Sequence, residues 1–240
     1  MRIALCFSGQ PRFVKETYKL YMDNLIIPNN ITDIFFHMWW DNTVFDKMGK
    51  VTNNPGIFWI DKRDLGFIVD NYKPIQILAE KADSIDKSPI FLKVPNTIPH
   101  LQVPVNNVKH SLYSAYRSIL LKKQFEIENN FVYDCVIKIR TDIELDKEIL
   151  IKDLNLNNIS VNGAYNNLEI GWCNDYYGIS NSSNMDIYSE IWHNFMDYNL
   201  NENCIFQCHQ LLFHHLCLKN NLKIDVTPDK HFHMFGRELY

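Results

Sequence analysis

Short apolar runs alternate along the chain with longer segments whose apolar residues recur at helical spacing. Short runs rich in β-branched and aromatic residues are typical of buried strands. We therefore predict strands at residues 2–8, 33–39, 74–78, 135–139, 159–161, 175–180 and 222–226. The helical periodicity predicts a first helix that ends near residue 25, and four further helices at 61–72, 107–129, 182–197 and 203–219. Strands alternating with helices indicate one α/β domain, residues 1–240, around a mostly parallel sheet.

The most informative part of this pattern is the stretch YDCVIKIRTDIELD, from Tyr133 to Asp146. Its apolar run leads directly into Arg140, Asp142 and Glu144. If the extended backbone continues, these three side chains project from one face, because strand side chains alternate. Two carboxylates there can hold a divalent cation through oxygen ligands, and open α/β sheets bind ligands at this end of their strands. The alternative is a solvated strand end with a surface salt bridge.

The first two predicted strands also end in polar or aromatic residues. The turn after the first contains Ser8, Gly9 and Arg12. Backbone N–H groups at a helix start can bind a phosphate, with Arg12 as a bidentate partner, although neither a G-x-G-x-x-G nor a P-loop pattern is present. After the second strand, Asp41 can accept hydrogen bonds from a ribose beside tryptophans that can stack on a ring. Turn geometry, a solvated arginine and core packing of the tryptophans are the simpler interpretations.

The rest of the chain contributes two candidate general bases and one basic spot. Asp175 begins an otherwise apolar strand, and Glu202 precedes a helix, where an acid also favours the helix N-terminus. Lys122 lies in a short basic spot that can meet a phosphate. The cysteines and histidines of residues 204–217 match no common zinc module, so helical packing is favoured. Near the end, His233 can bring an imidazole to a cation or serve the fold.

Composition excludes some classes of function. The formal net charge of −4 gives no electrostatic reason to expect nucleic-acid binding. No segment is long and apolar enough to predict a membrane span, and the first apolar run is too short for a signal-peptide core. The six cysteines show no compact disulfide framework, which favours a reducing, cytoplasmic compartment.

Several motifs, taken in their order along the chain, resemble a known family. They are LCFSGQPR, DIFFHMWWD, SLYSAYRSILLKKQFE followed by YDCVIKIRTDIEL, then NDYYGISNSSNMDIY and ENCIFQCHQLLFHHL. Together they resemble bacterial and viral glycosyltransferases of surface-polysaccharide synthesis, of the capsule and lipopolysaccharide type. The resemblance implies a GT-A-like, Rossmann-like fold, with a nucleotide- and metal-binding half at 1–150 and an acceptor-side half at 151–240. In a viral context the compartment would be the cytoplasm of the host cell.

The resemblance also implies a reaction and roles for the candidate residues. A sugar would pass from a UDP- or GDP-sugar to a hydroxyl group of a glycan acceptor, with assistance from Mn²⁺ or Mg²⁺. Asp142, Glu144 and His233 would hold the metal, although the second acid of the usual D-x-D motif is here a glutamate. In an inverting enzyme Asp175 or Glu202 would be the base; retention stays open. The donor would be bound by Ser8, Gly9, Arg12, Asp41, Lys122 and Arg140.

Two alternatives to this enzyme remain at the level of the sequence. One is a non-catalytic glycan- or nucleotide-binding module with the same fold, which the glutamate at position 144 leaves open. The other is a metal-dependent phosphoesterase that uses the same carboxylates. The phosphoesterase ranks last, because the chain lacks the dense Asp and His clusters that a two-metal site needs.

Overall fold

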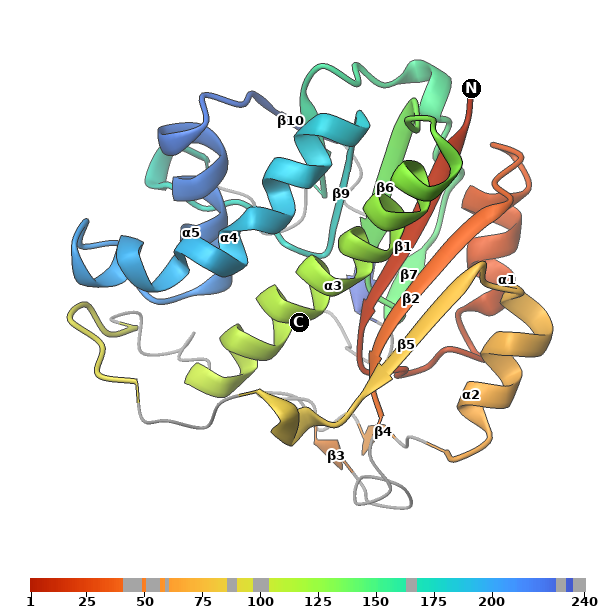
Figure 1. Ribbon diagram of the computed structural model, residues 1–240, viewed down its shortest axis with the longest axis horizontal. Coiled ribbons are helices and arrows are strands. Elements are labelled where there is room, and N and C mark those ends of the chain that lie inside the picture. Colours follow the sequence, from red (N-terminus) through yellow and green to blue (C-terminus); the bar gives the residue numbers. More distant parts are fainter. Residues whose placement is uncertain are drawn as a thin grey trace.

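A seven-stranded sheet organises the protein (Figure 1). The computed structural model describes residues 1–40, 49–50, 57–58, 61–85, 90–96, 104–162, 168–227 and 232–234. The strand order across the sheet is β10-β8-β9-β6-β1-β2-β5. The strands are β1 (Ile3–Gly9), β2 (Asp33–Trp39), β5 (Gln76–Glu80), β6 (Cys135–Ile139), β8 (Ile159–Val161), β9 (Tyr177–Ser180) and β10 (Ile224–Val226). The prediction of an α/β fold with a mostly parallel sheet is confirmed.

Strand direction decides which chain ends meet at each edge of the sheet. Strands β1, β2, β5 and β6 are mutually parallel, as are β8 and β10. Only β9, among these seven strands, runs antiparallel to its neighbours β6 and β8. The carboxyl ends of β1, β2, β5 and β6 therefore lie along one edge, and the segment that enters β9 begins at that same edge.

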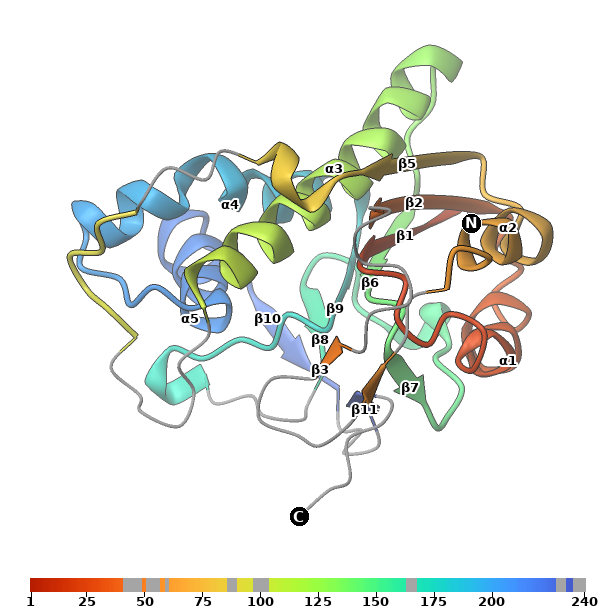
Figure 2. The same ribbon diagram turned by 90° about the horizontal axis from the view of Figure 1, so that it is seen from below.

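Helices cover both faces of the sheet (Figures 1 and 2). On one face lie α1 (Tyr18–Tyr21) with η1 (Met22–Ile26), and α2 (Asp64–Phe67) with η2 (Ile68–Tyr72). On the other lie α3 (Val105–Asn129), α4 (Ser182–Leu200) and α5 (Cys208–Phe213) with η7 (His214–Lys219). The segments η1, η2 and η7 are wider π-helical turns that continue the α-helices. Short 3₁₀ turns are η3 (Ala82–Ser84), η5 (Ile151–Asp153) and η6 (Leu168–Ile170).

Side chains of the central strands alternate between the two helical layers, as the period of a strand requires. In β1, Leu5 and Phe7 pack towards α1 and α2, whereas Ala4 and Cys6 pack towards α3. All of these side chains are buried, so each central strand is covered on both faces. This burial explains why the central strands appear in the sequence as continuous apolar runs.

The helix boundaries have identifiable local causes. Asn181 caps α4 by accepting a hydrogen bond from the backbone N–H of Asn184 at 2.9 Å. The long helix α3 ends where Asn130 adopts a left-handed conformation with φ of 53°. The helices predicted at 107–129 and 182–197 are both present. The one predicted at 203–219 begins only at Cys208, and the segment before Tyr18 forms turns.

The strand predicted to continue through residues 140–144 is interrupted. A turn at Thr141 and Asp142 ends β6, and a separate strand, β7 (Ile143–Leu145), follows. Strand β7 pairs antiparallel with β11 (Phe232–Met234), outside the main sheet. The expectation that Arg140, Asp142 and Glu144 share one face of a continuous strand is therefore wrong. A second small ladder joins β3 (Gly49–Lys50) to β4 (Ile57–Phe58).

Both predicted halves of the chain contribute to the main sheet. Strands β8, β9 and β10 belong to residues 151–240, yet they lie in the same sheet as β1, β2, β5 and β6. In the part of the chain that the structure describes, no helix has the length and apolar character that crossing a membrane requires.

Candidate functional site

The carboxyl-end edge of the parallel strands brings charged side chains from distant parts of the sequence together. Arg12 follows β1, and Arg140 and Asp142 follow β6. Asp175 lies just before β9, whose antiparallel direction brings its start to this edge. Helix α3 packs against β1 and β2, and its residues Ser111 and Ser114 add polar side chains. The predicted clustering of strand ends at one edge therefore holds for the residues that the structure describes.

A two-pronged ion pair joins Arg140 and Asp142. The Arg140 Nε donates to Asp142 Oδ1 at 2.8 Å, and Nη2 donates to Oδ2 at 2.7 Å. Arg12 Nη1 lies 3.9 Å from the same Oδ2. Burial alone would raise the pKa of Asp142, but the charge and hydrogen bonds of Arg140, together with Arg12, lower it below its ordinary value. Asp142 is therefore an ionised, buried carboxylate between two guanidinium groups.

The two arginines remain open to solvent where their shared carboxylate does not. The side chains of Arg12 and Arg140 are 26% and 24% exposed, against 6% for Asp142. Among the described residues, two guanidinium groups surround this one carboxylate, so these three side chains together carry a net positive charge. A partly exposed, net positive pair of guanidinium groups is suited to binding a phosphate or diphosphate.

Hydrogen bonds from side chains to backbone carbonyls hold the turn at Thr141 against the segment that follows β1. Thr141 Oγ1 donates to the Gln10 carbonyl, and Thr17 Oγ1 donates to the Thr141 carbonyl, both at 2.8 Å. Tyr21 Oη donates to the Arg140 carbonyl at 2.5 Å. These bonds connect residues more than a hundred positions apart and fix the direction in which Arg140 leaves β6. The position of Arg140 and Asp142 is therefore fixed by contacts with the segment between β1 and α1 and with α1 itself.

A hydrogen-bonded chain links four elements beneath the first loop. Gly9 N–H donates to Ser114 Oγ at 2.6 Å, and Ser114 Oγ lies 2.7 Å from His37 Nδ1. His37 Nε2 lies 2.9 Å from a carboxylate oxygen of Glu80, which also meets Arg117 Nε at 3.2 Å. Since the carboxylate only accepts, Nε2 carries the proton and Nδ1 accepts from the serine hydroxyl. Burial lowers the pKa of His37 to about 4, so this imidazole is neutral.

This chain changes the interpretation of the predicted phosphate cradle. Gly9 adopts a φ of +115°, a conformation that favours glycine. Its N–H group already donates to Ser114 Oγ. Ser8 is buried within β1, so its side chain does not reach the surface. Of the three cradle residues predicted from the sequence, Arg12 is the one whose side chain reaches the exposed edge. Trp39 is also buried and stacks on Tyr113, with ring centroids 5.5 Å apart, as core packing predicts.

Asp175 lies in a second polar cluster on the α3 side of β6. Lys138 Nζ donates to the Asp175 backbone carbonyl at 2.7 Å, and Ser111 Oγ lies 3.3 Å from Oδ2. His209 Nδ1 lies 3.6 Å from Oδ1. Burial would raise the pKa of Asp175, but the charges of His209, Lys138 and Arg140 and the Ser111 hydroxyl lower it. Burial in turn lowers the pKa of Lys138 to about 8.

Two predicted residues lie in contacts away from this edge. Lys122 is fully enclosed and donates to Glu126, Ser182 and Asp186, at 3.0, 2.7 and 2.7 Å. It therefore stabilises the packing of α3 against α4, and the phosphate contact predicted for it does not agree with this placement. The contacts of Glu202 are to His214 and Lys219, both at 2.9 Å, in η7.

The predicted metal ligands are only partly described. Glu144 is the half-buried residue of β7, and the β7–β11 ladder pairs its backbone with that of His233. Asp41, which was predicted to bind a ribose, lies outside the described residues. Both oxygens of Asp142 are engaged by Arg140, and among the described residues no three His, Cys, Asp or Glu side chains are placed to hold a metal ion.

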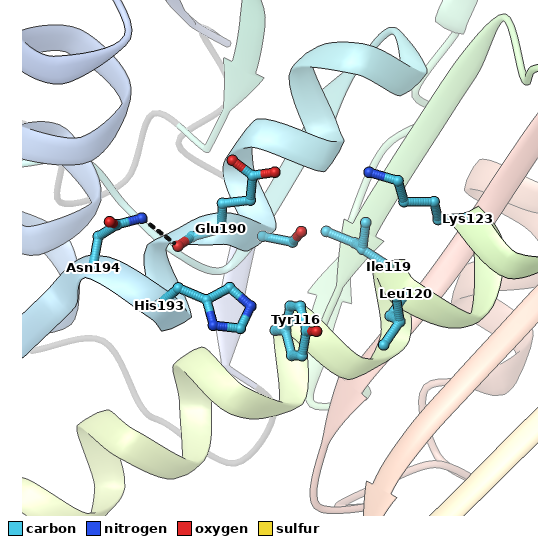
Figure 3. Close-up of a pocket in the computed structure, with 8 residues that line it drawn as sticks. Tyr116, Ile119, Leu120, Lys123, Glu190, His193 and Asn194 are labelled. Carbon is cyan, nitrogen blue, oxygen red and sulfur yellow. Dashed lines mark hydrogen bonds between the residues drawn. The ribbon is translucent and has the colours of Figure 1, made fainter.

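A surface pocket of about 250 Å³ lies between α3 and α4, away from the strand edge (Figure 3). Tyr116 and His193 face each other across it, with ring centroids 4.7 Å apart. Lys123 and Glu190 complete its charged lining. Its residues belong to the helical layer, so the pocket is separate from the Arg140–Asp142 cluster.

Sequence comparison adds no relative to this picture: no protein-family model matches the chain, and no curated protein matches it significantly.

The site residues that sequence reasoning missed are Ser111, Lys138 and His209. Lys138 interrupts an apolar run, which was the available signal, since a lysine inside a core strand needs a partner. The contact of Ser111 arises from helix packing and left no sequence signal, whereas His209 belongs to the cysteines and histidines of residues 204–217 that were weighed only as zinc ligands.

Proposed function

We propose that this protein transfers a sugar from a nucleoside-diphosphate sugar, UDP- or GDP-linked, to a hydroxyl group of a glycan acceptor. The observation that carries the proposal is the cluster of Arg12, Arg140 and Asp142. It offers two partly exposed guanidinium groups at the carboxyl ends of parallel strands, where open α/β sheets bind their ligands. The order of the motifs that resemble surface-polysaccharide glycosyltransferases supports the same function, as does the α/β sheet, for which we propose a GT-A-like arrangement.

The chemistry of the cluster suits a diphosphate leaving group. When the bond between the sugar and the diphosphate breaks, negative charge grows on the departing oxygen. Arg12 and Arg140 can stabilise that charge through paired N–H donors held in place before the reaction. Asp142 holds the fork of Arg140 in position. Assistance by Mn²⁺ or Mg²⁺ stays a prediction from the resemblance, and no step is assigned to it.

The remaining expectations belong to the same proposal. Glu202 stays the second candidate base, and Asp41 stays a candidate ribose ligand. All six cysteines are free thiols, which supports the cytoplasm as the compartment.

Thermal unfolding with donor sugars tests the proposal. A ligand that binds only the folded state stabilises it by about 2.7 kcal/mol at a hundred times its Kd. We expect a UDP- or GDP-hexose from a broad panel to raise the Tm, and Asp142→Ala to lose that rise while its far-UV circular dichroism stays native. Asp142→Asn, which keeps the side-chain shape, is the second variant. Absence of a Tm rise across the panel, with and without Mn²⁺, would contradict the proposal.

One observation favours a second function, a glycan- or nucleotide-binding module without turnover. Each oxygen of Asp142, the motif acid, already accepts a hydrogen bond from Arg140, so the carboxylate is engaged by a cationic side chain of the protein itself. A product assay separates the two functions, because a binding module shifts the Tm with the donor but releases no nucleoside diphosphate.

A further inference from the structure

We propose that His209, oriented by Asp175, is the group that accepts the proton of the acceptor hydroxyl. The inference rests on the proposed function and deepens it, because it assigns the base of the transfer to a histidine. Asp175, the carboxylate expected to be this base, becomes its positioning residue.

The tautomer of His209 follows from its hydrogen bond. Nδ1 lies 3.1 Å from the backbone carbonyl oxygen of Cys173. A carbonyl only accepts hydrogen bonds, so in the neutral ring Nδ1 carries the proton and Nε2 carries the lone pair. No partner within the described residues engages Nε2. The neutral ring therefore presents a free basic nitrogen, as a general base requires.

The ring is held in place on several sides. Trp172 stacks on it, with centroids 4.9 Å apart and planes at 25°. The Cys173 N–H donates to the His209 carbonyl at 3.2 Å, so the chain before β9 and the start of α5 are joined at this residue. Asp175 Oδ1 lies 3.6 Å from Nδ1, where its negative charge stabilises the imidazolium that forms when Nε2 takes a proton.

Exposure and charge favour His209 over Asp175 as the base. The side chain of His209 is 19% exposed and that of Asp175 only 11%. The carboxylate also lies near the positive charges of Lys138 and Arg140, which stabilise its ionised form and lower its pKa, so it is a weak proton acceptor. A buried, charge-paired carboxylate beside a more exposed imidazole is arranged to orient that imidazole.

The position of the pair matches the proposed donor site. Asp175 feels the charges of both Lys138 and Arg140, and the Arg140 guanidinium lies 5.6 Å from the ring centroid of Tyr176, the residue after Asp175. The base and the diphosphate-binding arginine are thus neighbours at one edge of the sheet. Among the described residues, the titratable or charged groups near the pair include Lys138 in β6, Arg140 just after β6, Tyr188 in α4, and Cys173 and Cys208 from the flanking segments.

The step is a single displacement. The acceptor oxygen forms a bond to the anomeric carbon while its proton passes to His209 Nε2. The bond from the anomeric carbon to the diphosphate oxygen breaks, and the nucleoside diphosphate leaves with the electron pair. No oxidant or reductant takes part, and the anomeric configuration inverts.

Replacement of the imidazole tests the assignment. His209→Asn keeps an N–H group near the position of Nδ1 to donate to the Cys173 carbonyl but removes the basic Nε2. With a panel of UDP- and GDP-hexoses and simple sugar acceptors, we expect kcat for nucleoside diphosphate release to fall at least about a hundredfold, with the donor-induced Tm rise retained. The wild-type rate should fall on acidification, because an imidazolium has no lone pair with which to accept the proton. His209→Asn should lose this pH dependence.

Two further variants separate catalysis from folding. Asp175→Asn removes the charge that stabilises the imidazolium formed in the step, so kcat should fall while the donor-induced Tm rise is kept. His193→Asn, on the exposed surface of α4, is the matched control and should leave kcat unchanged. If wild-type protein releases product and His209→Asn does so at the same rate, the assignment is overturned and the proposed function stands. If wild-type protein neither binds nor turns over any donor, both fall.

Discussion

Two networks of buried charge in this protein differ in how far their cationic side chains are exposed to solvent. In the α3–α4 network, Lys122 is fully enclosed and meets two carboxylates and a hydroxyl. In the strand-edge network, one buried carboxylate, Asp142, lies between two arginines that are about a quarter exposed. The first network satisfies its cation within the protein. Among the described residues, the second pairs two arginines with one carboxylate and leaves both arginine side chains partly exposed.

Solvent access of the cationic side chains separates a structural charge cluster from one that can bind a ligand. Each network contains a carboxylate or an ammonium group that is costly to bury without partners. Only the strand-edge network lies where parallel strands end and where an anion can reach it. Charge density in the sequence does not distinguish them, because Lys122-Lys123 and Arg140 both look like phosphate contacts there.

The largest expected effect is in the enclosed network. Lys122→Met leaves Glu126 buried without its cation, so we expect the free energy of unfolding to fall by about 3–5 kcal/mol. Lys123→Met is the matched control, because that lysine is 43% exposed and pairs with the same Asp186; its loss should stay below about 1 kcal/mol. Urea unfolding measures both. Equal losses in the two variants would show that Lys122 does not anchor the helix pair.

Acid should destabilise the protein by protonating His37, which lies in the hydrogen-bond network beneath the first loop. The folded protein holds His37 with a pKa of about 4, below the unfolded value near 6.5. Between these pH values the unfolded state binds the extra proton, so the free energy of unfolding falls as the pH falls, by roughly 3 kcal/mol in all. His37→Gln should remove that part of the pH dependence, measured by urea unfolding at pH 4 to 7. His193→Gln should keep it, and an unchanged pH slope in His37→Gln would refute the account.

The smallest expected effect sharpens the role of the open arginines. Arg140→Lys keeps the charge but loses the two-pronged contact with Asp142. We expect the Kd for the stabilising UDP- or GDP-hexose to rise about tenfold, or about 1.4 kcal/mol. Arg63→Lys, whose side chain is 78% exposed, should bind the donor as the wild type does. A large loss of folding stability in Arg140→Lys, similar to that of Lys122→Met, would remove the distinction between the two networks.

Much of the fold could be predicted because burial on both faces gives a strand a continuous apolar run. The runs at 2–8, 33–39 and 135–139 correspond to the three adjacent strands β1, β2 and β6. The sequence also placed Arg140 and Asp142 at the end of β6, but it predicted Asp142 as a metal ligand, with a surface salt bridge only as the alternative. The turn at Thr141 was missed, because it is held by hydrogen bonds from Thr17 and to Gln10, more than a hundred residues away.

The amino-acid sequence by itself determined the α/β class, the buried strands and the presence of Arg140, Asp142 and Asp175 beside them, because each depends on local patterns of apolar and charged residues. Only the tertiary structure decided that Lys122 is enclosed, that Arg140 occupies both oxygens of Asp142, and that His209 meets Asp175. Those outcomes depend on strand direction and helix packing. Both bring together side chains that no spacing along the chain relates.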